Sequence, residues 1–289
     1  MTVPTTLLTH PGGAHKDEFL ACSVLLAIHS IPLVRREPTP ADLEDPAVIV
    51  VDVGLRHEPA LNNFDHHQFP KDHTPTCALS LVLQHLGLYE DARQFCEWLE
   101  TAEWFDCRGP IETARWLGTE RGVLSKLASP IDFSLLRRFA LISRLEPGEP
   151  LWEMMRMVGE DFLSYVRSLR VRLDELARTA TFWDFTFSGQ NAKVLFLPRT
   201  DPLPDEPSFG LERFVASLPF AAEVVAVIYP DRRGDGYGLS RFQDHPRFDF
   251  RRIADDPLVR FAHARGFLAK TSATEIAELR RLLLAAVTP

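Results

Sequence analysis

The sequence predicts an α/β protein of two domains, and three observations support this. The chain has 289 residues, more than one ordinary domain needs. Strand-like and helix-like patterns alternate near the N-terminus, and the β-branched run at 48–53 is typical of a parallel strand buried on both faces. A Pro- and Gly-rich break at 146–150 precedes a change of pattern. We therefore expect a parallel-sheet domain over 1–148, and a connecting helix with a smaller α+β domain over 149–289.

The N-terminal elements follow from hydrophobic periodicity. Residues 7–9 form a short apolar run that ends in a Pro-Gly-Gly turn, and 17–28 then repeat apolar residues at helical spacing. A second strand is expected at 31–35 and a polar connection at 38–46. From 76 to about 144 the pattern is helical. This order predicts loops at the carboxyl ends of parallel strands, where open α/β sheets bind ligands.

The C-terminal part has a different pattern. A long helix is predicted from 152 to about 178. Strands are expected at 182–187, 194–197, 223–229 and 236–242. The segment 271–286 is predicted to close the chain as a helix, with Ser272 or Thr274 as its cap.

Composition and charge exclude several classes of protein. The net charge is −8, which argues against a protein that coats duplex DNA through basic residues. No apolar run reaches the roughly 18 residues of a membrane span, and the N-terminus has no signal-peptide pattern, so a cytoplasmic location is expected. Four cysteines without a CxxC pair are most simply reduced core residues.

Histidines and carboxylates gather at four places in the N-terminal half. These are the loop with His10, His15 and Asp17, the strand end at Asp52, the Asp65-His66-His67 string, and Asp106 at a predicted helix end. Imidazole with carboxylate and without thiolate is a ligand set for Mn, Mg, Co, Zn or Fe. Several carboxylates also allow one residue to bridge two metal ions. Two metal ions held in this way clamp a phosphate and activate a water molecule. The pattern predicts a divalent-metal site.

In their order, these motifs resemble the Myg-type exonuclease family of the DHH phosphoesterase superfamily. The similar stretches are 9–18 (THPGGAHKDE), 51–54 (VDVG), 64–69 (FDHHQF), 103–109 (EWFDCRG) and 260–268 (RFAHARGFL). The chain departs from the family pattern at two places. Ala269-Lys270 replaces a common Gly-Gly, and Cys107-Arg108 follows Asp106 where Asn is frequent.

The resemblance implies a DHH-type catalytic domain and a second, substrate-binding domain, with the active site in the cleft between them. It also implies two bound divalent cations, with manganese expected and magnesium, cobalt or zinc as alternatives. The implied metal ligands are His10, His15, Asp17, Asp52, His66 and Asp106. Asp52 would bridge both ions, and His66 would share the second ion with Asp17 and Asp106.

The resemblance also implies catalytic and substrate-binding residues. Asp52, Asp65 and His67 are the implied catalytic residues, since His67 would contact the scissile phosphate or assist the leaving group while Asp65 orients a histidine. The implied substrate contacts are His67, Arg108, His263, Arg265, Gly266 and Lys270.

The expected activity is hydrolysis of a phosphodiester, as an exonuclease on single-stranded RNA or short oligonucleotides. One alternative is a phosphoesterase or pyrophosphatase acting on a small (di)nucleotide or pyrophosphate. Another is a metal-binding protein without catalysis. A strip of arginines and aromatics in the second domain would favour nucleic acid, and its candidates are Arg232, Arg233, Tyr237, Arg241, Arg251 and Arg252. The oligomeric state, the metal and the polarity of cleavage stay open.

Overall fold

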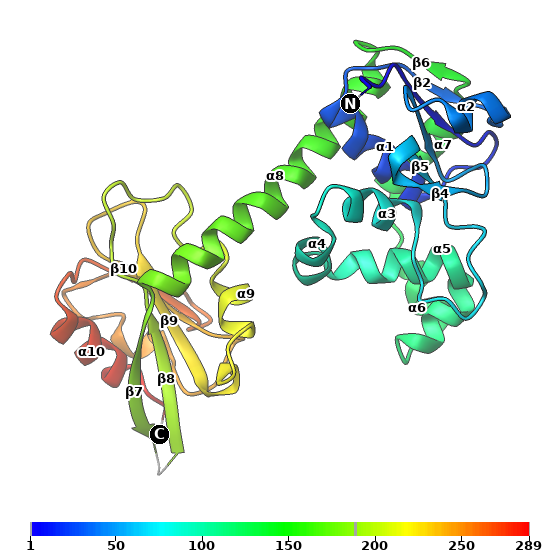
Figure 1. Ribbon diagram of the computed structural model, residues 1–289. Helices are drawn as coiled ribbons and strands as arrows, with labels where there is room; N and C mark the ends of the chain where they lie inside the picture. The colour runs from blue at the N-terminus through cyan, green and yellow to red at the C-terminus, as the bar shows by residue number, and fades with distance from the viewer. Residues whose placement is uncertain (1, 188–189, 289) are drawn as a thin grey trace. The chain divides into compact units, whose positions relative to one another are not determined.

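The computed structural model describes residues 2–187 and 190–288, which divide into two compact units. The first unit is Met1–Arg167 and the second is Ser168–Pro289, so the division falls within helix α8 (Pro150–Thr179). Each unit has its own six-stranded sheet, and most of the helices and strands are labelled in Figure 1. The predicted α/β class is confirmed, as is the long helix predicted over 152–178.

The sheet of the first unit is mostly parallel and has the order β4-β5-β3-β1-β2-β6. Its strands are β1 (Thr6–Thr9), β2 (Leu33–Arg35), β3 (Val48–Val51), β4 (His57–Glu58), β5 (Asn63–Phe64) and β6 (Arg144–Leu145). The pairs β1–β2, β1–β3 and β3–β5 are parallel, whereas the edge strands β4 and β6 are antiparallel. The three strands predicted here are confirmed, and the short strands β4, β5 and β6 were not predicted.

The central strands are buried on both faces, as their unbroken apolar runs predict. Leu7, Leu8 and Val50 have no exposed surface. Helix α1 (Lys16–Ile28) contacts β1 and β3, while Leu43 of α2 (Pro40–Glu44) packs against Leu8 and Val50. Helix α2 lies in the segment predicted as a polar connection. Its N-cap Thr39 accepts from the backbone N–H of Asp42, which supplies the start signal for this short helix.

Helix α8 approaches α1 very closely. A Cβ atom at Gly159 would lie 2.0 Å from the carbonyl oxygen of Ser23, which no side chain could tolerate. Glycine at this position therefore permits the backbones of α8 and α1 to touch. Trp152, at the start of α8, is also buried and donates its indole N–H to the carbonyl of Ile31. These contacts hold the first turns of α8 in the core of the first unit.

The helical pattern predicted over 76–144 resolves into five helices. They are α3 (Ala78–His85), α4 (Tyr89–Phe95), α5 (Glu97–Trp116), α6 (Arg121–Lys126) and α7 (Pro130–Ala140). Helix α5 is broken at Gly109, whose φ of 73° and ψ of 171° are not helical, and Pro110 follows. Asp106 consequently lies in the last turn before this break, in agreement with its predicted place at a helix end.

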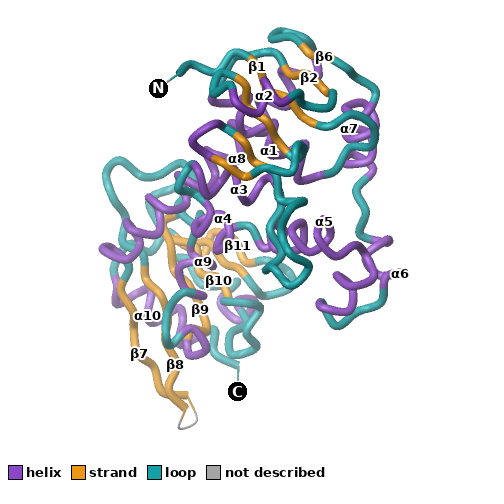
Figure 2. The backbone as a smooth tube through the Cα atoms, turned by 45° about the vertical axis from the view of Figure 1, so that its right-hand side comes forward, coloured by secondary structure: helices purple, strands orange, loops and turns teal. Residues whose placement is uncertain are grey.

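The second unit is a mixed sheet with the order β11-β12-β10-β9-β8-β7, seen as orange strands in Figure 2. Its strands are β7 (Thr181–Phe187), β8 (Gln190–Phe196), β9 (Val224–Pro230), β10 (Tyr237–Arg241), β11 (Val259–Ala262) and β12 (Leu268–Thr271). The helices are α9 (Leu211–Ala216) and α10 (Ile276–Ala285). Alternate residues such as Val194, Ile228 and Leu239 face a core that includes Leu279 and Leu282 of α10.

The predicted start of the last helix is wrong. Thr271 ends strand β12, and α10 begins only at Ile276 with Glu275 as its N-cap, so neither Ser272 nor Thr274 caps it. The Thr271 hydroxyl donates to the carbonyl of Leu258 and accepts from the N–H of Ala273. These bonds hold the chain extended where its local pattern favours a helix.

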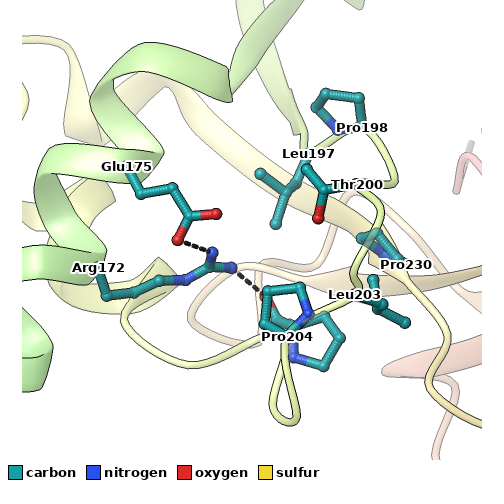
Figure 3. A pocket seen from close by; sticks show the side chains of 9 residues that line it. Arg172, Glu175, Leu197, Pro198, Thr200, Leu203, Pro204 and Pro230 are labelled. Atoms are coloured by element: carbon teal, nitrogen blue, oxygen red, sulfur yellow. Dashed lines mark hydrogen bonds and ion pairs between the residues drawn. The ribbon is translucent and has the colours of Figure 1, made fainter.

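A small hollow in the second unit is lined by Arg172, Glu175 and a proline-rich loop, as Figure 3 shows. Arg172 donates to Glu175 and to the carbonyl of Pro207, so its polar atoms already serve to fix that loop. Elsewhere in the fold, none of the described helices combines the length and apolar character that a membrane crossing requires.

Candidate metal centre

Asp52 occupies the carboxyl end of β3 in an unusual backbone conformation. Its φ is +59°, in the left-handed region that aspartate enters more readily than most residues. Its N–H donates to the carbonyl of Phe64, which ties it to β5. The turn of the backbone ends β3 at Val51 and brings the buried Asp52 side chain to the edge of the sheet where the predicted ligand loops lie.

The loop after β1 and the first turn of α1 bring three more predicted ligands to this edge. His10 has only 18% of its side chain exposed, and its Nε2 lies 3.5 Å from Oδ2 of Asp52. Its Nδ1 lies 2.9 Å from the carbonyl oxygen of Pro11, so a proton on Nδ1 leaves Nε2 free to bind a cation. Asp17 is buried in the first turn of α1 and accepts from the N–H of Ala78 at the start of α3. Two helix N-termini therefore favour its charged form, although burial and the neighbouring carboxylates outweigh them and raise its pKa.

The loop after β5 carries the Asp65-His66-His67 string, and Asp65 organises it. One carboxylate oxygen of Asp65 accepts from the N–H of His67 at 3.0 Å and lies 2.7 Å from His67 Nδ1. The other oxygen accepts from the N–H of Leu55 at 2.6 Å. Asp65 thus fixes both the loop and the ring of His67. This contact agrees with the implied orienting role, which stays a prediction.

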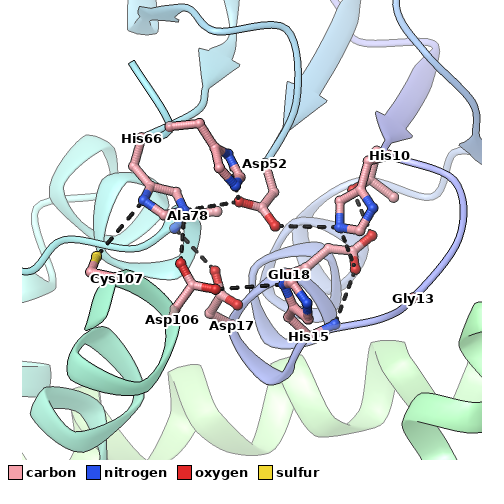
Figure 4. A network of polar contacts seen from close by, with 12 residues as sticks. His10, Gly13, His15, Asp17, Glu18, Asp52, His66, Ala78, Asp106 and Cys107 are labelled. Atoms are coloured by element: carbon pink, nitrogen blue, oxygen red, sulfur yellow. Dashed lines mark hydrogen bonds and ion pairs between the residues drawn. The ribbon is translucent and has the colours of Figure 1, made fainter. Parts of the chain in front are cut away.

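His66 points inward and joins two carboxylates from distant segments. Its Nε2 lies 3.2 Å from Asp52 Oδ1 and 2.8 Å from Asp106 Oδ2. Figure 4 shows His66 pointing toward both carboxylates. The second carboxylate oxygen of Asp106, Oδ1, lies 3.5 Å from Nδ1 of His15, whose side chain is 57% exposed. The structure therefore brings together all six residues predicted to bind metal.

The atoms at the centre of this cluster suit a cation. Both carboxylate oxygens of Asp52, Nε2 of His66 and Oδ2 of Asp106 are buried without a well-directed hydrogen bond, although they lie near one another. Buried polar atoms are rarely left in this condition unless an ion or water satisfies them. Overlapping groups with ligand atoms within 4.8 Å include His10 with His15 and Asp52, and His15 with Asp17 and Asp106. Nitrogen and oxygen donors of this kind fit divalent metals.

The electrostatics point the same way. Burial, followed by repulsion from Asp52 and Asp106, raises the pKa of Asp17 well above its usual range. Asp52 and then Glu18 raise the pKa of His10 to about 10. Burial lowers the pKa of His66, but Asp106 and Asp52 overcome this and raise it to about 12. Without a metal, the chain therefore balances its clustered carboxylates with protons, and divalent cations could supply that positive charge instead.

The carboxylate nearest to the His67 ring is Asp65, whose Oδ1 lies 2.7 Å from Nδ1, whereas the shared carboxylate of Asp52 lies 3.8 Å from the same atom. The side chain of His67 is 47% exposed, while Asp65 beside it is buried. Asp65, which accepts from the ring, raises the pKa of His67. A proton shared between Nδ1 and Asp65 leaves Nε2 directed away from that carboxylate, where a protonated ring can donate to an incoming anion.

Three residues that are not among the predicted ligands complete the cluster. Glu18 follows Asp17 in α1, is fully buried, and has Oε2 3.1 Å from Nε2 of His10. Arg35, on β2, is also buried and lies 3.2 Å from Oε1 of Glu18. Cys107 is the third addition, since its Sγ lies 3.8 Å from Nδ1 of His66. For Glu18 the only local signal is its place beside Asp17 in the first helical turn.

The predicted substrate contacts fall into two groups. In the first unit, Arg108 donates to the carbonyl of His73, so its side chain lies on the loop that follows the Asp65-His66-His67 string. In the second unit, His263, Arg265 and Gly266 lie in the turn between β11 and β12. Gly266 has a φ of +72°, and a Cβ there would lie 2.2 Å from Asp249 Oδ1, so this turn requires glycine.

The remaining basic and aromatic candidates of the second unit are largely engaged within it. Lys270 lies 3.2 Å from Asp231 and over the ring of Tyr229. Tyr237 is a core residue with 6% exposure, in the same apolar cluster as the buried face of α10, which excludes it from any surface strip. Arg251 makes a close ion pair with Asp249.

Comparison with known proteins supports the family resemblance. Residues 6–88 match the model of MYG1_exonuc, described as uncharacterised protein family UPF0160. No curated protein matches the chain. Among solved structures, RecJ from Thermus thermophilus in complex with Mn²⁺ aligns with 12% identity and a TM-score of 0.28, over 97% of this chain. This chain spans about half of that one, 51% of its length.

The matched segment carries most of the predicted metal ligands. His10, His15, Asp17, Asp52 and His66 lie within residues 6–88, whereas Asp106 lies beyond them. The resemblance to the Myg-type exonuclease family is thereby confirmed over residues 6–88, the segment that contributes five of the six predicted ligands.

Proposed function

We propose that this protein is a metal-dependent phosphodiester hydrolase, an exonuclease that cleaves single-stranded RNA or short oligonucleotides by a two-metal mechanism. The observation that carries the proposal is the convergence of six predicted ligands from separate segments on one buried cluster. Within this cluster, Nε2 of His66 lies 2.8 Å from Asp106 and 3.2 Å from Asp52. The match of residues 6–88 to an exonuclease family supports the reaction class.

In this proposal the cluster holds two divalent cations, with manganese expected. Asp52 would serve both, because Oδ2 faces His10 and Oδ1 faces His66. Asp17 and Asp106 would join His66, while His15 approaches the cluster from the exposed side. When bound, the cations would lower the pKa of a shared water toward about 7 and offset the charge of the phosphate.

Asp65 and His67 would handle the leaving group. Asp65 holds the His67 ring through Nδ1 at 2.7 Å and raises the pKa of that ring. His67 therefore keeps its proton to higher pH than an ordinary histidine. The Nε2 of this partly exposed ring would donate its proton to the departing oxygen of the substrate, as general acids do.

The test compares wild type with Asp52→Asn on a panel of single-stranded RNA and DNA oligonucleotides in Mn²⁺, with pyrophosphate and a dinucleotide as further substrates. We expect end-directed cleavage by wild type and its loss in the variant, with circular dichroism spectra unchanged. Cleavage of the dinucleotide or pyrophosphate alone would replace the nuclease with a small-substrate phosphoesterase. Equal activity in a folded Asp52→Asn variant would overturn the proposal, and metal binding without any hydrolysis would make the protein a non-catalytic metal binder.

A further inference from the structure

The loop that carries His10 and His15 lacks regular structure of its own. It connects Thr9, the last residue of β1, to Lys16, the first residue of α1. Gly12 has a φ of +89°, and a Cβ there or at Gly13 would meet no atom within 4 Å, so side-chain packing does not hold these two residues. A loop that positions two predicted ligands needs some other support, because metal sites depend on fixed ligand geometry.

Arg35 supplies that support from the neighbouring strand. It is the register partner of Thr9 across β1 and β2, and its side chain is 1% exposed. Its guanidinium donates to the carbonyls of Gly12 at 3.3 Å and Gly13 at 3.0 Å. It also donates to the carbonyl of Phe139 at 2.9 Å and lies 4.4 Å from the centroid of that ring. One planar cation thereby fastens the loop to β2 and α7.

Glu18 fastens the same loop from inside. It accepts from the hydroxyl of Thr9 at 2.7 Å and from Arg35 at 3.2 Å. It also accepts from the N–H of His15 at 3.4 Å. Its Oε2 lies 3.1 Å from Nε2 of His10, so the same carboxylate touches the ring of a predicted ligand.

A buried ion pair of this kind needs a reason other than net stability. Removing two charges from water costs roughly as much free energy as their mutual attraction returns, so such pairs often contribute little to folding. Their best-attested use is to specify one arrangement among several. Here the specified arrangement is the backbone of residues 9–15. The hydrogen bonds of Arg35 and Glu18 end on residues of that loop, on each other, or on Phe139 of α7.

We propose that Glu18 and Arg35 are positioning residues that hold the His10–His15 loop ready for metal. This inference rests on the proposed function, because it assumes that His10 and His15 bind the cations. Neither residue needs to bind the metal itself. Arg35 keeps the loop carbonyls and the Glu18 charge engaged, and Glu18 holds the two ends of the loop through the Thr9 hydroxyl and the N–H of His15.

The experiment uses Arg35→Lys, which keeps the charge but cannot reach two loop carbonyls, the Phe139 carbonyl and Glu18 at once. Arg36→Lys is the matched control, because Arg36 is the next residue and binds Asp42 of α2 instead of the loop. Isothermal titration with Mn²⁺ measures affinity, and hydrogen exchange of metal-free protein measures protection of the His15 amide, which donates to Glu18. We expect Arg35→Lys to weaken Mn²⁺ binding by about 10–100-fold, as loss of an outer partner does, and to lose protection there.

Kinetics separate positioning from general damage. Saturating Mn²⁺ is expected to restore most of the kcat of Arg35→Lys, whereas a merely structural defect would leave kcat low at any metal concentration. Wild-type affinity and wild-type exchange in Arg35→Lys would overturn the inference. If that variant does not fold, Thr9→Val decides, since it removes one hydrogen bond to Glu18 and should weaken Mn²⁺ binding less but in the same direction. If wild type itself binds no Mn²⁺, the proposed function fails, and the exchange data alone still judge whether Arg35 and Glu18 hold the loop.

Discussion

His66 Nε2 lies 2.8 Å from Asp106 Oδ2, which joins the loop after β5 to the last helical turn before the break in α5. Cys107, the next residue of α5, contacts the other ring nitrogen of His66. Asp106 lies outside the segment that matches the family model. It therefore gives an independent test of whether the cluster binds metal.

Loss of a residue that supports a metal ligand from outside lowers metal affinity by about 10–100-fold. Asp106→Asn should lower Mn²⁺ affinity by more than this, because it removes a charged predicted ligand itself. Titration calorimetry would measure the loss. Glu112→Gln on the same helix is the control, since Glu112 pairs with Arg115 and not with the cluster. Unchanged affinity in Asp106→Asn would remove Asp106 from the ligand set.

His67→Gln should lower kcat by about 10²–10⁴-fold if the ring is a general acid. The loss should be much smaller on a p-nitrophenyl phosphodiester, because that leaving group departs without a proton. Asp65→Asn should show the same dependence on leaving group to a smaller extent, since it removes only the partner at 2.7 Å. An equal loss on both substrates would instead indicate that His67 binds the phosphate.

Mn²⁺ affinity should rise with pH. A histidine must be neutral before its nitrogen binds a cation, and the carboxylates of the metal-free cluster raise the pKa of His10 to about 10 and of His66 to about 12. Both rings are protonated near neutral pH, so metal binding has to release protons. Calorimetry in buffers of different ionisation enthalpy counts the released protons, and a count of zero would contradict this description of the apo site.

Gly109→Ala should destabilise the protein by about 1 kcal/mol, because alanine is strained at a φ of +73° even though a Cβ there meets nothing within 4 Å. Gly122→Ala is the matched control. Gly122 lies inside α6 without a positive φ and also has open space around it, so alanine should be neutral or stabilising there. Thermal unfolding of both variants would show whether the two changes have opposite signs.

Glu103 offers a stability test away from the metal ligands. It is buried and accepts from Ser80 at 2.6 Å and Tyr89 at 2.8 Å, and burial raises its pKa. The folded chain then holds a proton where the unfolded chain has lost it. The free energy of unfolding should therefore fall as pH rises from about 4.3, the usual glutamate pKa, through the raised value.

Glu103→Gln should remove this part of the pH dependence, which urea unfolding at several pH values would measure. Glu100→Gln is the control, because Glu100 also contacts Arg93 but is 43% exposed. If the two variants unfold with the same pH profile, burial does not raise the pKa of Glu103 as described.

The sequence predicts the fold best where local pattern and burial agree. The run at 48–53 is apolar except for Asp52, and β3 is buried accordingly. Thr271 shows the opposite case, because its hydroxyl bonds to Leu258, a residue its local pattern cannot indicate. The short strands β4 and β5 have two residues each, too few to show a period.

The candidate site divides in the same way. The predicted ligands stand in motifs at the ends of strands and helices, so chain order predicts that they gather, and the family resemblance implies their role as ligands. Glu18 and Arg35 do not, because their partnership depends on the register that places Arg35 beside Thr9. Only the folded sheet brings this guanidinium to the loop carbonyls, and no spacing in the sequence indicates it.

The left-handed turn at Asp52, with its φ of +59°, brings its side chain to a site that exists only in the folded chain. The predicted ligands around it come from the β1–α1 loop, α1, the loop after β5 and α5, so an unfolded chain would have no pocket to bind a cation. Cations that bind only the native state stabilise it by mass action, through RT ln(1 + [L]/Kd). If the cluster binds cations as proposed, metal supply would set the free energy of unfolding as well as the activity, and chelation would lower that free energy.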